Sequence, residues 1–368
     1  MLVRDNKYIP QEDKDFFILL RIGLWQRVEE ELSPSPDWSY IYKLSCEQTV
    51  QGIVADGIGL YKTKYSCNIP SDINEQFLSA VAQIVRRNHQ INKKQAEINR
   101  LFDEQSIRYY VVKGQDAARN YPKPMLRCSG DIDYAIRIAD FTRTQSVLMP
   151  LASYVHPYEE NKQDQSFEIS GVTVELHGNL RPSLGSRIDR AIDTLYDEMF
   201  LGATSYETFT TVYIFIHCLQ HYHWTGLGIR QISDFAMILD TSYERIDFAR
   251  VNAAIIQEMR LPYEWNVFIR FCTDYLGMVP WYATKEQYES IRQGKVLQSL
   301  SLWLYCRDTG NFGHNHKAVR HTDFLIRNFI GVVGIFREYF RTRTVSPSLC
   351  RTLIGLRFNE YKKQLKRF

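Results

Sequence analysis

The apolar positions divide the chain into a helical N-terminal part, a short region of strands and a second helical part. Residues 11–62 show helical periodicity, and the segment Ser33–Asp37, with its two prolines, should end one helix and cap the next. Residues 72–106 contain no proline or glycine and place apolar residues three, four or seven apart, which predicts one helix of roughly nine turns. The apolar residues of this face are Ile73, Phe77, Val81, Ile84, Ile91, Ile98 and Phe102.

After residue 106 the pattern changes from helical spacing to short runs of β-branched and aromatic residues, which are typical of strands. Glycine and proline separate these runs and indicate turns between them. The predicted elements are a strand at 108–112, a short helix at 115–120, a strand at 131–138, a helix at 140–151 and a hairpin of strands at 166–169 and 172–176.

From about residue 187 to the end the pattern is helical again, with breaks at Pro262, Pro280 and Pro347. We therefore expect an α/β fold of the α+β type, mostly helical, with a small mixed sheet flanked by helices. The predicted domains are an N-terminal helical region at 1–105, an α/β core at 106–185 and a C-terminal helical domain at 186–368.

Composition limits the classes of protein that this chain can belong to. Of its 368 residues 45% are hydrophobic and 24% are charged, which is ordinary for a soluble globular protein. The net charge of +3 is too small to indicate a nucleic-acid partner. Several basic residues lie near the C-terminus, which is more typical of a solvated helix end than of a nucleic-acid site. An RNA-binding module that uses these residues is nevertheless one alternative function for the chain. These residues are Lys362, Lys363, Lys366 and Arg367.

The seven cysteines are dispersed and form no CxxC pair, which argues against a disulfide framework and against a zinc ribbon. The first residues carry charges where a signal peptide needs an apolar stretch. No apolar run approaches the roughly 18 residues that a membrane helix needs. We therefore expect a cytoplasmic protein in a reducing compartment, without a membrane partner.

Two aspartates, Asp131 and Asp133, lie one residue apart on a predicted strand. Residues i and i+2 of a strand point to the same face, so the two carboxylates should converge. Converging carboxylates repel each other unless a cation or a proton lies between them. Mg²⁺ prefers oxygen ligands and often works beside substrate phosphates, so this segment is a candidate site for phosphoryl or nucleotidyl transfer.

A third carboxylate is expected from the predicted strand 172–177. Its apolar residues alternate with Thr173, Glu175 and His177, which should share the opposite face. If this strand lies beside Asp131 and Asp133, Glu175 completes a set of three carboxylates that suits two Mg²⁺ ions. From these three residues alone, solvated carboxylates on an exposed strand explain the pattern equally well.

Lys113 and Gly114 follow the first predicted strand. A glycine between a strand and a helix lets backbone N–H groups approach phosphate, and Lys113 could supply a positive charge to a triphosphate. A turn glycine beside a surface lysine is the simpler alternative. The two residues together, shortly before the pair of aspartates, favour the phosphate-binding interpretation.

The pattern of these motifs resembles the uncharacterised bacterial nucleotidyltransferase family related to the polymerase-β superfamily. A later segment, 219–239, is similar to the helical H…H…G…R…D part of that family, and Gly310-Asn311-Phe312-Gly313 resembles its GNFG motif. The matching core residues are Lys113, Gly114, Tyr121, Pro122, Pro124, Arg127, Gly130, Asp131, Ile132, Asp133, Glu175 and His177.

This resemblance implies a Mg²⁺-dependent enzyme that transfers an NMP from an NTP donor to a hydroxyl acceptor and releases pyrophosphate. The acceptor could be a small molecule, a protein or RNA. The catalytic and metal-binding residues would be Asp131, Asp133 and Glu175, with Glu175 nearest the acceptor hydroxyl. The nucleotide-binding residues would be Lys113, Gly114, Arg127, Gly130, His177 and Arg230. The alternative is a catalytically inactive nucleotide-binding or scaffold protein on the same fold.

The chain departs from the wider superfamily between its glycine and its aspartates, because Asp131 comes seventeen residues after Gly114 instead of about ten. Arg127, in this insertion, could brace the loop or neutralise pyrophosphate. Replacing Asp131 or Asp133 with asparagine should abolish turnover and leave the fold intact, because mutual repulsion is lost.

Further along the chain, His217 and His221 could share a helix face as zinc ligands do, although the sequence shows no third ligand at a recognisable spacing. Arg230 could contact phosphate or form a structural ion pair with Asp234 four residues later. Cys128 has no base partner in the sequence and is interpreted as incidental.

Overall fold

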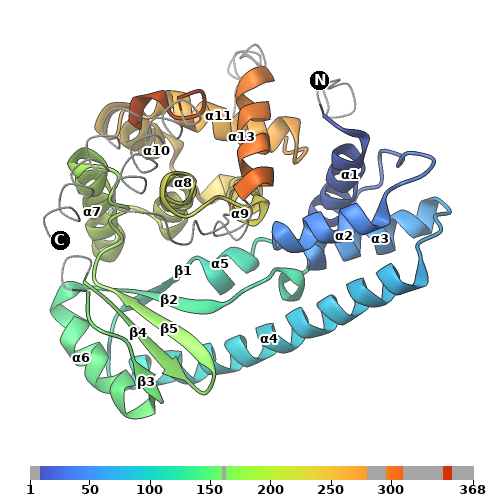
Figure 1. Ribbon diagram of the computed structural model, residues 1–368. Coiled ribbons are helices and arrows are strands. Elements are labelled where there is room, and N and C mark those ends of the chain that lie inside the picture. Colours follow the sequence, from blue (N-terminus) through green and yellow to red (C-terminus); the bar gives the residue numbers. More distant parts are fainter. Residues whose placement is uncertain (1–8, 160–162, 280–295, 310–342, 350–368) are drawn as a thin grey trace, which may run out of the picture.

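The computed structural model describes residues 9–159, 163–279, 296–309 and 343–349. Its strands form a small sheet, which has α4 and α6 on one side and the helices that follow β5 in the chain on the other (Figure 1). We call these later helices, from α7 onward, the C-terminal helices. This mostly helical architecture with a small mixed sheet confirms the predicted fold class. Among the helices in these ranges, none is both long and apolar enough to cross a membrane.

Three helices form the N-terminal part: α1 (Gln11–Trp25), α2 (Trp38–Glu47) and α3 (Gln51–Lys64). The side chain of Asp37 accepts a hydrogen bond from the backbone N–H of Tyr40, so the predicted cap of α2 is confirmed. The first helix ends earlier than expected, at Trp25, because Gln26 takes a left-handed conformation with φ 57°. Where α1 crosses α3, a side chain on Gly57 would collide with a backbone carbonyl of α1, which explains the glycine.

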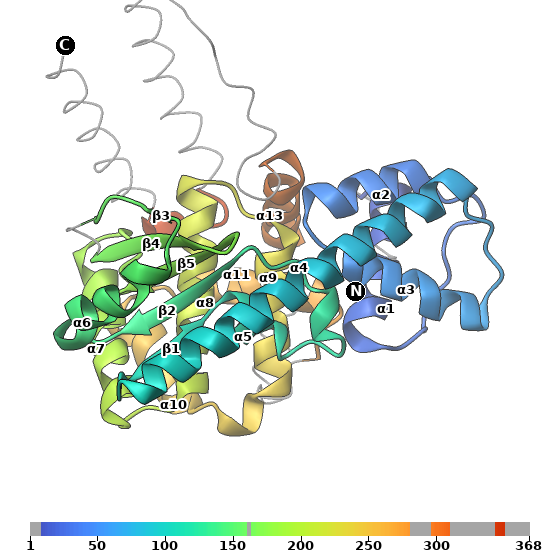
Figure 2. The same cartoon turned by 90° about the horizontal axis from the view of Figure 1, so that it is seen from below.

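Helix α4 (Ser71–Glu104) is a single helix of 34 residues, as predicted. It runs along the N-terminal helices at one end and beneath the sheet at the other (Figure 2). Ile73 and Phe77 pack in the same core as α1–α3, whereas Ile91, Ile98 and Phe102 pack against the sheet. Because α4 belongs to both cores, the predicted boundary at residue 105 stays a prediction.

Within the described residues the sheet has five strands, in the order β1-β2-β5-β4-β3. Strands β2 and β5 are parallel and the other neighbours are antiparallel. The predicted hairpin is confirmed, since β4 and β5 pair across the turn at Ser170 and Gly171. The strands are β1 (Tyr109–Val112), β2 (Asp131–Ile136), β3 (Tyr154–Val155), β4 (Asp164–Ile169) and β5 (Val172–His177).

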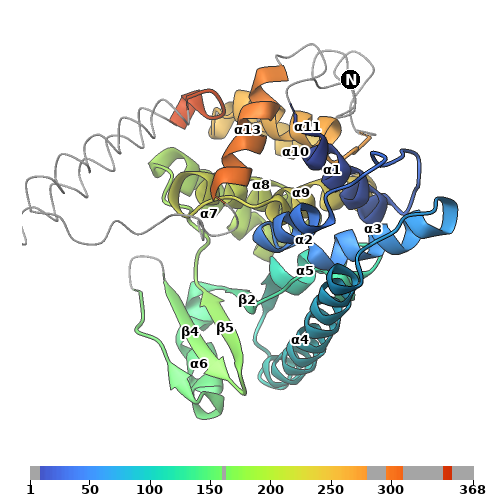
Figure 3. The same cartoon turned by 45° about the vertical axis from the view of Figure 1, so that its right-hand side comes forward.

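The two faces of the sheet differ in chemistry. One face is apolar, with Ile132, Tyr134, Val174 and Leu176 buried against α4 and α6 (Ile138–Leu148). The other face carries the polar residues of β2 and β5 and lies toward the C-terminal helices (Figure 3). The connection from β1 to β2 contains the short helices α5 (Gly114–Ala118) and η2 (Pro124–Leu126).

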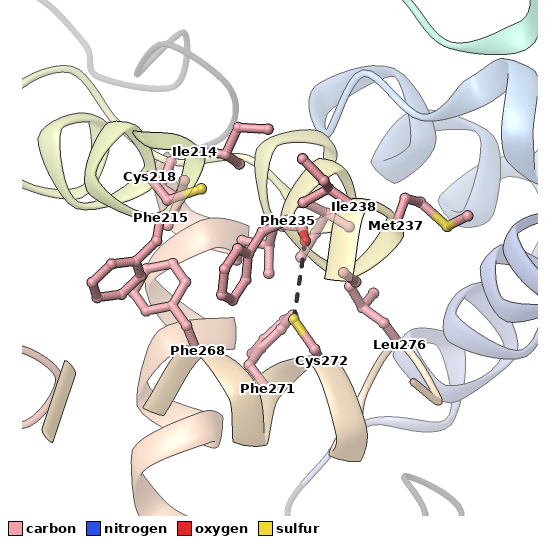
Figure 4. Packing of buried hydrophobic residues seen from close by; sticks show 14 of the residues in the cluster. Ile214, Phe215, Cys218, Phe235, Met237, Ile238, Phe268, Phe271, Cys272 and Leu276 are labelled. Atoms are coloured by element: carbon pink, nitrogen blue, oxygen red, sulfur yellow. Dashed lines mark hydrogen bonds between the residues drawn. The ribbon is translucent and has the colours of Figure 1, made fainter. Parts of the chain in front are cut away.

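The C-terminal helices pack around a large apolar core in which Phe215, Phe235 and Phe268 meet (Figure 4). This core continues to the N-terminal helices, because Trp303 packs on Phe17 and donates a hydrogen bond to the buried Asp13 (2.9 Å). The helices are α7 (Ser186–Leu201), α8 (Tyr206–Trp224), α9 (Ile229–Thr241), η4 (Tyr243–Arg245), α10 (Phe248–Asn252), η5 (Ala253–Glu258), α11 (Pro262–Asp274) and α13 (Val296–Thr309).

Candidate active site

The parallel pairing of β2 and β5 brings the predicted carboxylates together. Asp133 lies directly opposite Glu175 in the register of the two strands, and Ala135 lies opposite His177. Glu175 and His177 therefore share a face with Asp131 and Asp133, as the alternation of polar residues predicts. The arrangement of the two strands is confirmed, while the role of each carboxylate stays a prediction.

Asp133 is the centre of this group, with 2% of its surface exposed. Its Oδ1 lies 2.9 Å from Nζ of Lys113 and 2.8 Å from Nε2 of His177. Burial alone would raise the pKa of Asp133, but the charge of Lys113 and the hydrogen bond from His177 outweigh it and hold this pKa well below its ordinary value. Asp133 is therefore ionised at neutral pH without any metal ion.

His177 links two carboxylates, since its Nδ1 lies 2.6 Å from Oδ1 of Asp164 while its Nε2 faces Asp133. Burial and the charge of Lys113 lower the pKa of His177, but the hydrogen bonds to Asp133 and Asp164 prevail and raise it to about 9. Asp164 is not among the site residues predicted from the sequence. The hairpin turn at residues 170 and 171 places residue 164 opposite residue 177, so the signal was present.

The other two carboxylates carry protons more readily. The negative charge of Asp133, together with burial, raises the pKa of Asp131. Burial, followed by the charge of Asp133, raises the pKa of Glu175 to about 7. Ligand atoms of Asp133, Glu175 and His177 all lie within 4.8 Å of one another, so this buried cluster could hold a metal ion.

The raised pKa of Glu175 predicts how the stability of the ligand-free protein depends on pH. The ordinary value is 4.5, so between pH 4.5 and about 7 the folded protein keeps a proton that the unfolded chain loses. Stability should therefore fall as pH rises through this window, and Glu175→Gln should remove that fall. We expect the variant to exceed the wild type by about 1–2 kcal/mol at pH 8, with little difference near pH 4.5.

Urea unfolding with a chelator present, at pH 5 and pH 8, measures this difference. Glu104→Gln, at an exposed position at the end of α4, is the control and should change nothing at either pH. An equal effect of Glu175→Gln at both pH values would show that the carboxyl of Glu175 is not protonated in the folded protein.

The turn after β1 positions Lys113. Its backbone has φ 59° and ψ −146°, a conformation that residues other than glycine seldom adopt, and Gly114 follows with φ 33°. A Cβ atom on Gly114 would lie 3.2 Å from the carbonyl oxygen of Asp131, so the glycine permits close packing on β2. Helix α5 has only five residues, so its N-terminus offers little attraction for phosphate. The turn instead directs Lys113 toward Asp133.

Arg127 links the connection between β1 and β2 to α9, while both roles predicted for it, bracing the loop and neutralising pyrophosphate, stay predictions. Its Nε and Nη2 donate to the two carboxylate oxygens of Asp234 on α9, both at 2.6 Å. Tyr121 also donates to Asp234, at 2.7 Å. Arg127 has 4% of its surface exposed, so this bidentate ion pair is buried. It ties the insertion between Gly114 and Asp131 to the C-terminal helices.

Two further predicted nucleotide-binding residues lie at the edges of the same region. Nη1 of Arg230, on α9, donates to the carbonyl oxygen of Cys128 (2.7 Å). The carbonyl oxygen of Gly130 accepts a hydrogen bond from Nη2 of Arg87 (2.7 Å). Arg87, on α4, was not predicted, because nothing in the sequence distinguishes it from the other polar residues of that helix.

His217 and His221 contact each other on α8, with their Nε2 atoms 3.0 Å apart. Nδ1 of His221 also lies 2.7 Å from Oγ1 of Thr225. Burial lowers the pKa of both rings, to about 4 for His221, so both are neutral at pH 7. Within the described part of the chain no third ligand completes a metal site with them, so the structure gives no support to a zinc site.

Most of the predicted site residues line one cavity of about 250 Å³ between the sheet and helices α8 and α9, whereas His177 does not line it. Cationic, anionic and neutral hydrogen-bonding groups meet in it, which suits a ligand with phosphate groups and a bound cation. The residues concerned are Lys113, Arg127, Arg230, Asp131, Asp133, Glu175, Asp234, His217 and His221. The motif Gly310–Gly313 and the basic residues 362–367 lie outside the described residues.

A family model described as "Uncharacterised nucleotidyltransferase" matches residues 34–276, about two thirds of the chain. Comparison with curated proteins found no match. One solved structure, described as "Structure and function of the polymerase core of TRAMP, a RNA surveillance complex", is similar at 14% sequence identity. The alignment covers 87% of this chain and 99% of the chain in that structure. Its TM-score is 0.20, which is too low to support an argument about fold or function.

Proposed function

The chain belongs to the family of uncharacterised nucleotidyltransferases, and on that premise we propose that it transfers an NMP from an NTP to a hydroxyl acceptor and releases pyrophosphate. One observation carries this proposal. The carboxylates of Asp133 and Glu175, on adjacent parallel strands, face the same cavity as the cationic side chains of Lys113 and Arg230. Nucleotidyl transfer needs both kinds of group, since carboxylates hold the metal and cations bind phosphate.

The donor atoms fit Mg²⁺, which prefers oxygen ligands. Asp131, Asp133 and Glu175 would hold it, in the two-metal arrangement that the resemblance to the polymerase-β superfamily suggests. When bound, Mg²⁺ would lower the pKa of the acceptor hydroxyl and neutralise charge on the triphosphate. The raised pKa values of Asp131 and Glu175 support this assignment, because burial and the charge of Asp133 disfavour the ionised form of both carboxylates, and a bound cation would stabilise that form.

Lys113 would act on the triphosphate. Burial lowers its pKa, but the charge of Asp133 outweighs burial and raises this pKa well above its ordinary value, so the ammonium group is charged at any physiological pH. In the ligand-free protein it pairs with Asp133. We propose that it turns toward the phosphates once Asp133 has a metal ion as its counter-charge, while Arg127 keeps the loop in place.

Which molecule accepts the NMP is left open by the cavity, and a small molecule, a protein hydroxyl and RNA are all compatible with this chemistry. The net charge of +3 offers no strong electrostatic attraction for a long nucleic acid. The dispersed cysteines, six of which are free thiols among the described residues, suit a reducing cytoplasmic setting.

Thermal unfolding in the presence of nucleotides tests the proposal. ATP, GTP, CTP and UTP are added singly, each with and without Mg²⁺, and a ligand at about 100 times its Kd should stabilise the fold by about 2.7 kcal/mol. We expect one nucleotide to do so only with Mg²⁺, and pyrophosphate release to follow when acceptors are added. Lys113→Met should lose the nucleotide-dependent part of the stabilisation, whereas Lys93→Met, at an exposed position on α4, should keep it.

A catalytically inactive nucleotide-binding protein is the second candidate. One observation favours it: Lys113 and His177 already neutralise Asp133, so the fold does not depend on a metal ion there. Such a protein would be stabilised by a nucleotide equally with and without Mg²⁺, and it would release no pyrophosphate with any acceptor.

A further inference from the structure

His177 lies where a metal ligand would lie, deeper in the site than Asp131. Its Nε2 is 2.8 Å from Oδ1 of Asp133 and 3.5 Å from Oε2 of Glu175. Adjacent ligand atoms of a six-coordinate ion with bonds of about 2.1 Å lie about 3 Å apart. The two distances from Nε2 are therefore close to those between neighbouring ligands on one ion, and ligand atoms of all three residues lie within 4.8 Å of one another.

Asp164 holds the ring of His177 in the orientation that such a ligand needs. Its Oδ1 lies 2.6 Å from Nδ1, so Nδ1–H donates to this carboxylate and Nε2 points at Asp133 and Glu175. A histidine that binds a metal through one nitrogen usually donates its other N–H to a carboxylate or a carbonyl. Both strands of the hairpin thus contribute, β4 with Asp164 and β5 with His177.

We propose that the site has two metal positions of different chemistry that share Asp133. The outer position, at Asp131 and Asp133, offers only oxygen ligands and suits Mg²⁺. The inner position, at Asp133, Glu175 and His177, offers a nitrogen ligand as well and prefers a transition-metal ion such as Mn²⁺. This assignment of metals rests on the proposed nucleotidyl transfer and names the ions that such a site would select.

The chemistry of the donor atoms gives this preference. Imidazole favours transition metals, whereas carboxylate and water ligands alone suit Mg²⁺ and Mn²⁺ alike. The inner position is also the more enclosed one, since two of its three residues, Asp133 and His177, are buried, whereas Glu175 and Asp131 are half-buried. Binding there would release the proton of Nε2 to solvent and move Lys113 away from Oδ1 of Asp133, its present partner at 2.9 Å.

The alternative for His177 is that Nε2–H only donates a hydrogen bond to Asp133 and thereby positions it. Electron paramagnetic resonance of the full-length protein with Mn²⁺ alone separates the two roles, because a coordinated imidazole nitrogen couples to the Mn²⁺ electron spin. We expect a ¹⁴N coupling in the wild type that changes when histidine is labelled with ¹⁵N, and that disappears in His177→Gln.

Calorimetry supplies the affinities. We expect the wild type to bind Mn²⁺ more tightly than Mg²⁺, and His177→Gln to lose most of that difference. Asp164→Asn keeps His177 but loosens its orientation, so it should weaken Mn²⁺ binding by about 10–100-fold and retain the ¹⁴N coupling. His156→Gln replaces a half-exposed histidine that pairs with Glu168 on the same sheet and should change neither measurement.

Tight Mn²⁺ binding without ¹⁴N coupling would overturn the inner position and leave His177 as a hydrogen-bond donor. Coupling that persists in His177→Gln would overturn it too, because another histidine would then be the ligand. If His177→Gln does not fold, the labelled wild type and Asp164→Asn still decide. Since no NTP is present in these measurements, their result is independent of whether the protein transfers nucleotides.

Discussion

Asp133→Asn should reduce nucleotidyl transfer by at least about 1,000-fold and also destabilise the ligand-free protein by about 2–4 kcal/mol. The first effect follows because the variant loses the carboxylate that both proposed metal positions share. The second follows because Lys113 and His177 face Asp133 in a buried site. A neutral amide leaves Lys113 without its ion-pair partner and removes one of the carboxylates that His177 contacts, so that Asp164 is its remaining close partner.

This expectation differs from the one that the sequence supports. From the sequence, Asp131 and Asp133 repel each other, and either substitution should leave the fold intact. The structure reverses this for Asp133, whose pKa is held well below its ordinary value by Lys113 and His177 against the effect of burial. For Asp131 the expectation is unchanged, because the charge of Asp133 raises its pKa and makes its own negative charge unfavourable.

Asp131→Asn is therefore the matched control for Asp133→Asn. Both variants should lose turnover, but only Asp133→Asn should unfold at a lower urea concentration when a chelator is present. Pyrophosphate release measures turnover with the donor nucleotide identified by thermal unfolding. Equal stability of the two variants would mean that Lys113 and His177 do not depend on Asp133. Wild-type turnover by Asp133→Asn would exclude the metal site.

Most elements of the fold could be predicted because their signals are local. Helix α4 repeats its apolar residues at helical spacing over 34 positions. The hairpin of β4 and β5 is indicated by alternating apolar and polar residues on either side of the turn at Ser170 and Gly171. The face shared by Glu175 and His177 follows from the same alternation. The end of α1 could not be predicted in this way, since Gln26 adopts a left-handed conformation that residues other than glycine and asparagine seldom signal.

The site was only partly predictable because its decisive contacts join distant parts of the chain. The sequence placed Lys113 near phosphate, but its partner in the ligand-free protein is Asp133, twenty residues later. It likewise assigned His177 to the nucleotide, whereas the ring contacts Asp133 and Asp164. Pairing of β2 with β5 brings these groups together, and a parallel pair leaves no turn in the sequence that would fix its register.

Arg127→Met is expected to cost about 3–5 kcal/mol of stability, because it leaves Asp234 charged and buried without its bidentate partner. The hydrogen bond from Tyr121 to Asp234 cannot replace that charge. Nucleotide binding should weaken only as far as the loop from Gly114 to Asp131 loses its position. The double variant Arg127→Met/Asp234→Leu should recover part of the loss, since both buried charges are then gone.

The exposed ion pair between Arg181 and Asp193 provides the comparison for this buried one. Nε of Arg181 donates to both carboxylate oxygens of Asp193, at 2.9 and 2.8 Å, and Nη2 lies 2.8 Å from Oδ2. Because 49% of the Arg181 side chain is exposed, Arg181→Met should cost less than about 1 kcal/mol. Urea unfolding of the wild type, Arg127→Met, Asp234→Leu and the double variant gives the coupling energy between Arg127 and Asp234. If Arg127→Met kept wild-type stability and lost nucleotide binding, Arg127 would contact the pyrophosphate instead of bracing the loop. A large coupling energy would show that the ion pair holds the insertion against α9. The insertion joins Lys113 to Asp131, so the same ion pair would help to fix the positions of these two residues in the site.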